Sequence, residues 1–247
     1  MCIRDSGTPV DQMARLGGFA EEMLIHQNGL VKVTPDMPLE KACLIGCGVT
    51  TGFGAAVRTA QVPVGATVCV IGCGGIGLSA VQGARVAGAG RIIAVDMSVE
   101  KLDTARLMGA TDTVNASEVD DVVTAVRDMT SGGVEYSFEA IGLKQTAEQA
   151  FEMLDLGGTA TIIGMVPSNT KMEIRGIELL SEKKLQGSMM GSNRFRTDIP
   201  QMIDLYLNGK LLLDEMVSAT IDLEQVNEGY GWMKAGTIAR TVITFET

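Results

Sequence analysis

The feature that most constrains the fold is a run of glycines between two apolar segments. The apolar run Val68–Ile71 leads directly into Gly72-Cys73-Gly74-Gly75-Ile76-Gly77, and a helical pattern follows from Leu78 to about Val86. A second apolar run, Ile92–Val95, ends at Asp96. The order strand, glycine-rich turn, helix, strand and acid is typical of the first half of a dinucleotide-binding α/β sheet.

The glycines of this turn have separate physical roles. Gly72 permits a tight turn, Gly74 lets a pyrophosphate approach the backbone, and Gly77 lets the helix pack close to the sheet. The helix N-terminus offers free N–H groups and a positive dipole end to phosphate. Asp96 stands 19 residues after Gly77, where a carboxylate can bind the ribose hydroxyls. We therefore predict a dinucleotide site. The alternatives are a turn that binds nothing and a turn that binds a ligand such as S-adenosylmethionine.

The acid at the end of the second strand also indicates which dinucleotide is bound. A carboxylate accepts hydrogen bonds from a ribose 2′-hydroxyl and repels a 2′-phosphate. Met97 and Ser98, which follow Asp96, add no positive charge. The sequence therefore favours NAD over NADP.

Strands and helices alternate with short connections from Thr67 to Ile163, which predicts a doubly wound parallel sheet. Ser98 and Gly109 are expected to begin and end a helix over residues 99–108. The carboxyl ends of parallel strands meet at one edge, so four residues are expected there: Gly72, Asp96, Ile141 and Gly164. Further expected helices cover residues 119–130, 146–154, 178–184, 198–207 and 223–233, and further strands cover 113–114, 134–139, 159–163, 184–190, 216–221 and 239–245.

The first third of the chain is less regular. Residues 1–7 show no periodicity, and we leave them out of the fold prediction. Phe19–Val33 has two apolar runs around Asn28-Gly29, which predicts a β-hairpin. A helix is expected to start at Leu39, to be broken by the glycines of residues 45–52, and to resume at Phe53.

Composition excludes several classes of function. The 247-residue chain has a formal net charge of −10, so nucleic acid is not an expected partner. No run of 18 apolar residues occurs, so no membrane span is expected. The five cysteines form no disulfide pattern, which favours a reducing, cytoplasmic location. The single histidine, His26, is expected at the surface.

Four sequence blocks resemble a known family. They are LIGCGVTTGFGAA at 44–56, VIGCGGIG at 70–77, AVD at 94–96, and the closing pattern from DIPQMIDLYLNGK to IARTVITF. These blocks are similar to those of zinc-dependent alcohol dehydrogenases of the medium-chain superfamily, nearest to the class III-like bacterial branch. The similarity runs from about Phe19 to Phe245.

The resemblance implies a Rossmann domain with parts of a GroES-like catalytic domain at both ends. The implied bounds are 1–48 for the first part of the catalytic domain, 49–190 for the NAD-binding domain and 191–247 for the second part. It also implies a homodimer or homotetramer that pairs near residues 185–190.

The resemblance assigns roles to individual residues, each with a plainer alternative. Cys47 matches a zinc ligand, or is a partly buried free thiol. Thr51 matches a catalytic-site residue beside the nicotinamide, or caps a helix. Ile76 and Ile163 match residues behind the nicotinamide ring, or are core. The implied cofactor-binding set, including residues already named for their place in the turn, is Gly72, Gly74, Gly75, Ile76, Gly77, Asp96, Lys101, Ile141, Ile163 and Arg240. Within it, Lys101 would bind the ribose and Arg240 the pyrophosphate; otherwise both are surface charges.

The sequence also departs from the family. No segment matches the family's remaining catalytic zinc ligands, its proton relay or its structural zinc lobe, and we expect an N-terminally truncated chain. The parent enzyme would oxidise an alcohol to an aldehyde or ketone with NAD and zinc, whereas this chain by itself is expected to be inactive. The alternatives are an NAD-binding, dimerising protein without catalysis and a zinc-free reductase of the same superfamily. Cys47 argues against the reductase, and a methyltransferase fits least.

Overall fold

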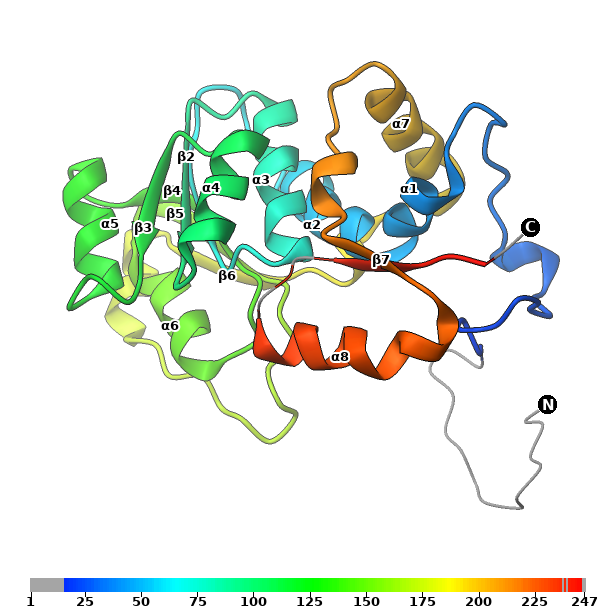
Figure 1. Ribbon diagram of the computed structural model, residues 1–247. Helices are drawn as coiled ribbons and strands as arrows, with labels where there is room; N and C mark the ends of the chain where they lie inside the picture. The colour runs from blue at the N-terminus through cyan, green and yellow to red at the C-terminus, as the bar shows by residue number, and fades with distance from the viewer. Residues whose placement is uncertain (1–15, 237, 239, 246–247) are drawn as a thin grey trace.

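The larger of the two sheets has six parallel strands, in the left half of the view in Figure 1. The computed structural model describes residues 16–236, 238 and 240–245. The strand order is β3-β2-β1-β4-β5-β6, the order of dinucleotide-binding sheets. This confirms the predicted doubly wound α/β fold. The strands are β1 (Thr67–Ile71), β2 (Arg91–Asp96), β3 (Asp112–Asn115), β4 (Val134–Glu139), β5 (Leu154–Ile162) and β6 (Lys184–Gly187).

Helices cover both faces of the sheet. Along β1, Val68 and Val70 point to a core shared with α2, α3, α4 and α7, while Cys69 and Ile71 point to a core shared with α5 and α6. Both faces are thus dry, which explains why β1 is a continuous apolar run. The helices are α1 (Leu39–Leu44), α2 (Thr50–Gly54), α3 (Gly75–Ala87), α4 (Val99–Met108), α5 (Val122–Thr130), α6 (Lys144–Glu152), α7 (Phe195–Leu207) and α8 (Val226–Ala235).

The C-terminal part forms a small separate sheet. Strands β7 (Ala219–Ile221) and β8 (Thr241–Ile243) pair in parallel, and α8 runs beside them (Figure 1). A Cβ at Gly229 of α8 would lie 3.0 Å from Ile221 Cδ1, so the helix packs closely on β7. Short 3₁₀ turns complete this architecture: η2 (Gln27–Gly29), η5 (Gly176–Ser181), η6 (Met190–Ser192), η7 (Asp214–Met216) and η8 (Leu223–Gln225).

Helix α4 confirms the end signals that the sequence contains. It runs over the predicted residues, and its first turn is capped by Ser98 Oγ, which accepts from Lys101 N at 3.3 Å. Gly109 ends it with a left-handed φ of 119°. Helix α5 begins three residues later than predicted because its N-cap is Asp121, whose Oδ2 accepts a hydrogen bond from Thr124 N at 2.9 Å.

The predicted hairpin over Phe19–Val33 is wrong. Within that range the described structure has only the 3₁₀ turn η2, and most of its side chains are exposed, including Leu24 at 99%. A two-stranded hairpin by itself is marginally stable in water. Alternating apolar residues cannot hold one when the fold does not bury them. The expectation for residues 1–7 lies outside the described residues.

The predicted helix break at residues 45–52 is also wrong. One helix runs from Leu39 to Thr59 through α1, α2 and two π-helical segments, η3 (Ile45–Val49) and η4 (Ala55–Thr59). Its glycines allow close approach rather than ending the helix. A Cβ at Gly52 would lie 2.0 Å from the carbonyl oxygen of Ile76, and one at Gly54 would lie 2.4 Å from that of Gly191.

The same helix is long and apolar enough to cross a membrane by length and composition alone. In the structure 61% of its most apolar window is buried. It packs against α3 and η6, so the described fold accounts for its apolar character as that of an internal helix.

The close approach at Gly52 generates a stability prediction. Gly52→Ala is expected to lower the free energy of unfolding by about 2–4 kcal/mol, because its methyl group would overlap the backbone at Ile76. Gly46→Ala lies in the same helix with no atom within 4 Å of its Cβ, and is expected to be neutral or to stabilise by up to about 1 kcal/mol. Urea unfolding of the two variants tests this. Equal stabilities would contradict the packing role of Gly52.

Candidate functional site

The carboxyl ends of the central strands meet at one edge of the sheet. Ile71 at the end of β1 lies level with Val95 on one side and Glu139 on the other. Gly72, Asp96 and Ile141 therefore lie side by side at the carboxyl ends of three neighbouring strands. Gly164 joins them from β5, donating its N–H to Glu139 O at 3.0 Å. This edge is where doubly wound sheets bind ligands.

The glycine turn has the geometry of an anion-binding loop. Gly72 has a φ of 93° and donates to Val95 O at 2.8 Å. A Cβ at Gly77 would lie 1.7 Å from Gly72 O, so only glycine lets α3 start this close to the strand. Gly74 is the N-cap of α3 and provides no side-chain cap, and no atom lies within 4 Å of its Cβ position. The helix N-terminus therefore faces open space at Gly74.

Arg240 reaches this turn from the far end of the sequence. Its Nε would lie 2.2 Å from a Cβ at Gly75, and its Nη2 would lie 2.0 Å from one at Gly48. The guanidinium thus lies between the start of α3 and the 39–59 helix. It makes no hydrogen bond or ion pair with another described residue. A half-buried cation without a described anion beside a helix N-terminus is suited to bind phosphate.

Asp96 ties the end of β2 to the glycine turn. Its Oδ2 accepts from Cys73 N at 2.7 Å, and its Oδ1 accepts from Met97 N at 2.8 Å and Ser98 N at 3.1 Å. The carboxylate is half-buried at the edge, so its charge is held in one place. Lys101 lies further along, with its Nζ 3.7 Å from the Cβ position of Gly236 at the end of α8.

The residues predicted to lie beside the nicotinamide are mostly buried. Thr51 is 7% exposed, and its hydroxyl lies 3.6 Å from Met190 Sδ. It stands inside a continuous helix, so the alternative of a capping hydroxyl is wrong. Ile163 is 8% exposed, and Ile76 packs partly against the same core. Ile141 is exposed and lies over Gly72, since a Cβ there would be 2.5 Å from its Cγ1.

The four described cysteines are free thiols of two kinds. Cys69 and Cys73 are buried, and burial raises the pKa of each thiol far above its usual range. Cys43 and Cys47 are exposed on the 39–59 helix. Burial of part of its side chain also raises the pKa of Cys43. Cys47 is thus an accessible thiol.

A zinc site needs at least three protein ligands. Among residues 16–236, 238 and 240–245, no group of three His, Cys, Asp or Glu side chains is placed to hold a metal. His26 is exposed, as predicted, and its Nδ1 accepts from Asn28 N at 3.1 Å. The described residues therefore do not fit a complete zinc centre.

Two residues at this edge were given no site role from the sequence. Met97 is 71% exposed and follows β2, so it provides apolar surface on the other side of β1 from Ile141. Glu139 is wholly buried at the end of β4. Its place at the carboxyl end of a predicted strand was a signal for Glu139, but the sequence does not show that its side chain turns inward.

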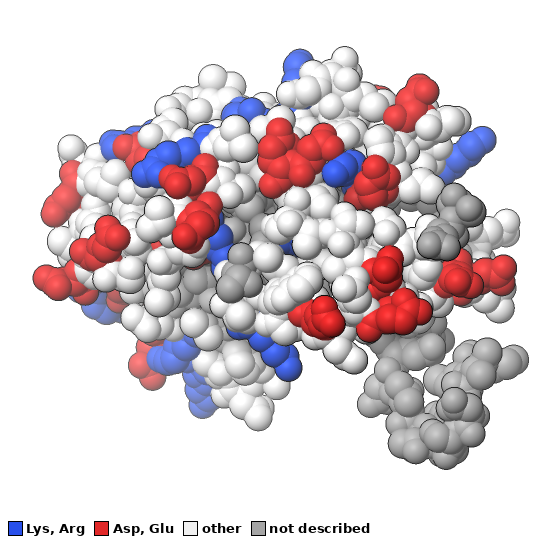
Figure 2. All heavy atoms as spheres, viewed as in Figure 1, with Lys and Arg blue, Asp and Glu red and all other residues white. Residues whose placement is uncertain are grey.

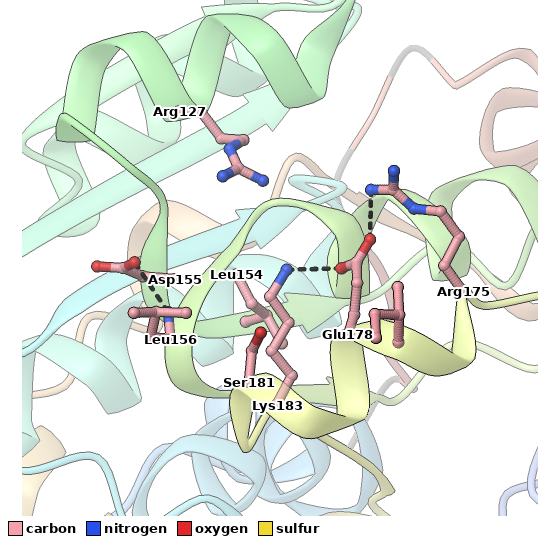
Figure 3. A pocket seen from close by; sticks show the side chains of 9 residues that line it. Arg127, Leu154, Asp155, Leu156, Arg175, Glu178, Ser181 and Lys183 are labelled. Atoms are coloured by element: carbon pink, nitrogen blue, oxygen red, sulfur yellow. Dashed lines mark hydrogen bonds and ion pairs between the residues drawn. The ribbon is translucent and has the colours of Figure 1, made fainter.

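A separate cavity of about 250 Å³ lies at the amino ends of β5 and β6 (Figure 3). Glu178 there ion-pairs with Lys183, at 2.7 Å, and with Arg175. Although burial raises it, the two cations leave the pKa of Glu178 below its usual value. Three of the charged side chains that line the cavity, Arg175, Glu178 and Lys183, are thus paired with one another, and the cavity lies away from the glycine turn. On the face seen in Figure 2, basic residues are likewise interspersed with acidic ones.

Comparison with known proteins gives consistent matches. The family model described as zinc-binding dehydrogenase matches residues 75–208. The chain is 38% identical to alcohol dehydrogenase class-3 of Cereibacter sphaeroides and 36% identical to S-(hydroxymethyl)glutathione dehydrogenase of Paracoccus denitrificans. Each match covers 97% of this chain and 66% of the relative. The chain therefore spans just under two thirds of these relatives.

A solved structure shares the fold. The alcohol dehydrogenase zinc-binding domain protein from Burkholderia ambifaria superposes with a TM-score of 0.84 at 35% identity. The match covers 88% of this chain and 58% of that one.

The position of Arg240 generates a binding prediction. Arg240→Ala is expected to weaken NAD binding by about 1.5–3 kcal/mol, the range for a hydrogen bond to a charged group. Isothermal titration with NAD measures the change. Arg106→Ala is the control, because Arg106 lies near the end of α4 and is bound to Asp103 and Thr113. Unchanged affinity in Arg240→Ala would place this guanidinium outside the site.

Proposed function

The chain belongs to the zinc-binding dehydrogenase family, and from this premise we propose that it is the NAD-binding part of an alcohol dehydrogenase. The parent reaction moves a hydride from the carbinol carbon of an alcohol to NAD, giving an aldehyde or ketone, NADH and a proton. The observation that carries the proposal is the open N-terminus of α3 at Gly74, flanked by Arg240 and Asp96.

Different residues at this edge bind different parts of the cofactor. The N–H groups at the start of α3 and the Arg240 guanidinium bind the pyrophosphate. Asp96 accepts from the adenosine ribose, with Lys101 beside it. Ile141 and Met97, exposed on either side of β1, offer apolar surface to the adenine. Thr51, Ile76 and Ile163 lie on the nicotinamide side.

The fixed charge of Asp96 is the reason for NAD rather than NADP. Three backbone N–H groups hold its carboxylate in place, so the carboxylate cannot easily turn away from a 2′-phosphate. Bound NAD supplies the hydride acceptor. This chain's residues bind and orient it.

The described residues can bind NAD, but they do not provide a complete set of zinc ligands. The described residues offer Cys47 as an accessible thiol but no group of three His, Cys, Asp or Glu side chains, so they do not form a complete zinc site. This observation favours a second candidate function, in which the 247-residue chain alone binds NAD and dimerises without catalysis.

The substrate is a small alcohol or aldehyde. One relative is named for the glutathione adduct of formaldehyde, and we extend to this chain the broader class of alcohols and thiol adducts. The free cysteines support a reducing, cytoplasmic setting. The domain bounds at 48/49 and 190/191 stay predictions.

We place the contact between subunits at the outer edge of the sheet. β6 is one of the two edge strands of the sheet, the other being β3, and exposed apolar side chains gather near β6, including Leu180 at 81% and Met189 at 84%. An exposed strand edge with apolar neighbours is a surface that a second copy can cover. A homodimer or homotetramer is proposed on this basis.

Asp96→Asn tests the cofactor preference. It keeps the shape of the side chain and removes its charge, so NAD affinity should fall and NADP affinity should rise. The ratio of the two dissociation constants is expected to shift toward NADP by about tenfold or more, which corresponds to about 1.4 kcal/mol. Fluorescence titrations with NADH and NADPH measure it. Equal binding of both by the unmutated chain would overturn the preference.

Zinc content and turnover test the ligand count. The purified 247-residue chain is expected to bind NAD, to hold less than one tightly bound zinc per subunit, and to produce no NADH from a primary alcohol, because three protein ligands are required. Elemental analysis and absorbance at the NADH band measure these quantities. Stoichiometric zinc together with turnover would reveal a site that the described residues do not contain.

A further inference from the structure

Glu139 is a wholly buried acid at the cofactor edge, and its two oxygens have unequal surroundings. Oε1 accepts three hydrogen bonds, from Ile141 N at 2.9 Å, Gly142 N at 2.7 Å and Thr146 Oγ1 at 2.8 Å. Oε2 has no hydrogen-bond partner among the described residues. All three donors belong to the turn from β4 into α6 or to the first turn of α6.

Burying a carboxylate is costly unless charges or donors compensate for it. No lysine, arginine or histidine among the described residues forms an ion pair with Glu139. Compensation comes from the three donors and from the positive end of α6, whose N-cap residue Leu143 provides no side-chain cap. The charge thus strengthens bonds that hold one particular turn.

This turn carries the exposed side chain that lies over the glycine loop. Ile141 Cγ1 would lie 2.5 Å from a Cβ at Gly72. On its other side the turn meets the end of β5, because a Cβ at Gly164 would lie 2.1 Å from Gly142 N and 2.6 Å from Glu139 Oε2. Glu139 therefore holds together the loops that follow β4 and β5, next to the loop that follows β1.

We propose that Glu139 is a positioning residue for the dinucleotide, fixing the 140–142 turn so that Ile141 presents its apolar face to the cofactor. The proposal rests on the proposed function, since it assumes that this edge binds NAD. Glu139 itself is sealed from the ligand by the turn that it holds and acts through Ile141. Its loss should loosen the turn and weaken cofactor binding beyond any effect on stability.

Glu139→Gln on the full 247-residue chain tests this. Glutamine keeps one carbonyl acceptor but loses the charge, and charge-assisted hydrogen bonds are about twice as strong as neutral ones. Its amide also places N–H donors at the position of Oε2, which has no hydrogen-bond partner among the described residues. NADH titration is expected to show about tenfold weaker binding. Hydrogen exchange should be faster at the amides of Ile141 and Gly142.

Asp198→Asn is the matched control for stability. Asp198 is also a buried acid, 2% exposed, and it binds Arg58 Nη2 at 2.9 Å and Arg194 N at 2.7 Å in the first turn of α7. This variant should lower the melting temperature but change NADH affinity by less than about twofold. A purely structural role for Glu139 predicts equal affinities in both variants at temperatures where both are folded, and that result would overturn the proposal.

Thr146→Val carries the test if Glu139→Gln does not fold. It removes one of the three donors and leaves the carboxylate in place. NADH binding about twofold to fourfold weaker, with faster exchange at Ile141 and Gly142, supports the proposal. Unchanged binding and exchange in this variant would refute it. Failure of the unmutated chain to bind NADH would instead refute the proposed function.

Discussion

The architecture of the binding edge depends on one backbone contact. Gly77 lies so close to the carbonyl oxygen of Gly72 that any side chain at residue 77 would overlap it. This contact sets where α3 begins relative to the end of β1. The free N–H groups of that helix then face the same edge of the sheet as Asp96 and the turn after β4. The polar groups of this edge therefore come from strand ends and a helix N-terminus.

Arg240 adds the second constraint. It is the residue before β8, at the far end of the sequence, yet its guanidinium packs against Gly75 and Gly48. Three segments distant in sequence thus meet around one cation. The chain is acidic, with a net charge of −10. The positive potential that a diphosphate requires therefore comes from Arg240 and the N-terminus of α3, and not from a basic surface.

The sequence predicted those parts of the fold whose causes are local. The glycine turn, the caps of α4 and the alternation of strands and helices follow from neighbouring residues. The glycines of the 39–59 helix were misread as a break because their partners, Ile76, Gly191 and Arg240, lie elsewhere in the chain. The hairpin over Phe19–Val33 failed for the opposite reason: its local pattern was present, but the described fold does not bury it.

The candidate site was predictable to the same extent. The residues of the glycine turn and Asp96 were expected at one edge because parallel strands end together. Glu139 could not be assigned, because its burial depends on the turn after β5 folding over it.

The packing of Arg240 against Gly48 has a mechanical consequence. The guanidinium fills the space beside Gly48, because its Nη2 would lie 2.0 Å from a Cβ there. It also fills the space beside Gly75, where its Nε would lie 2.2 Å from a Cβ. A side chain at either residue would therefore displace the arginine from the start of α3, although the two glycines belong to different helices.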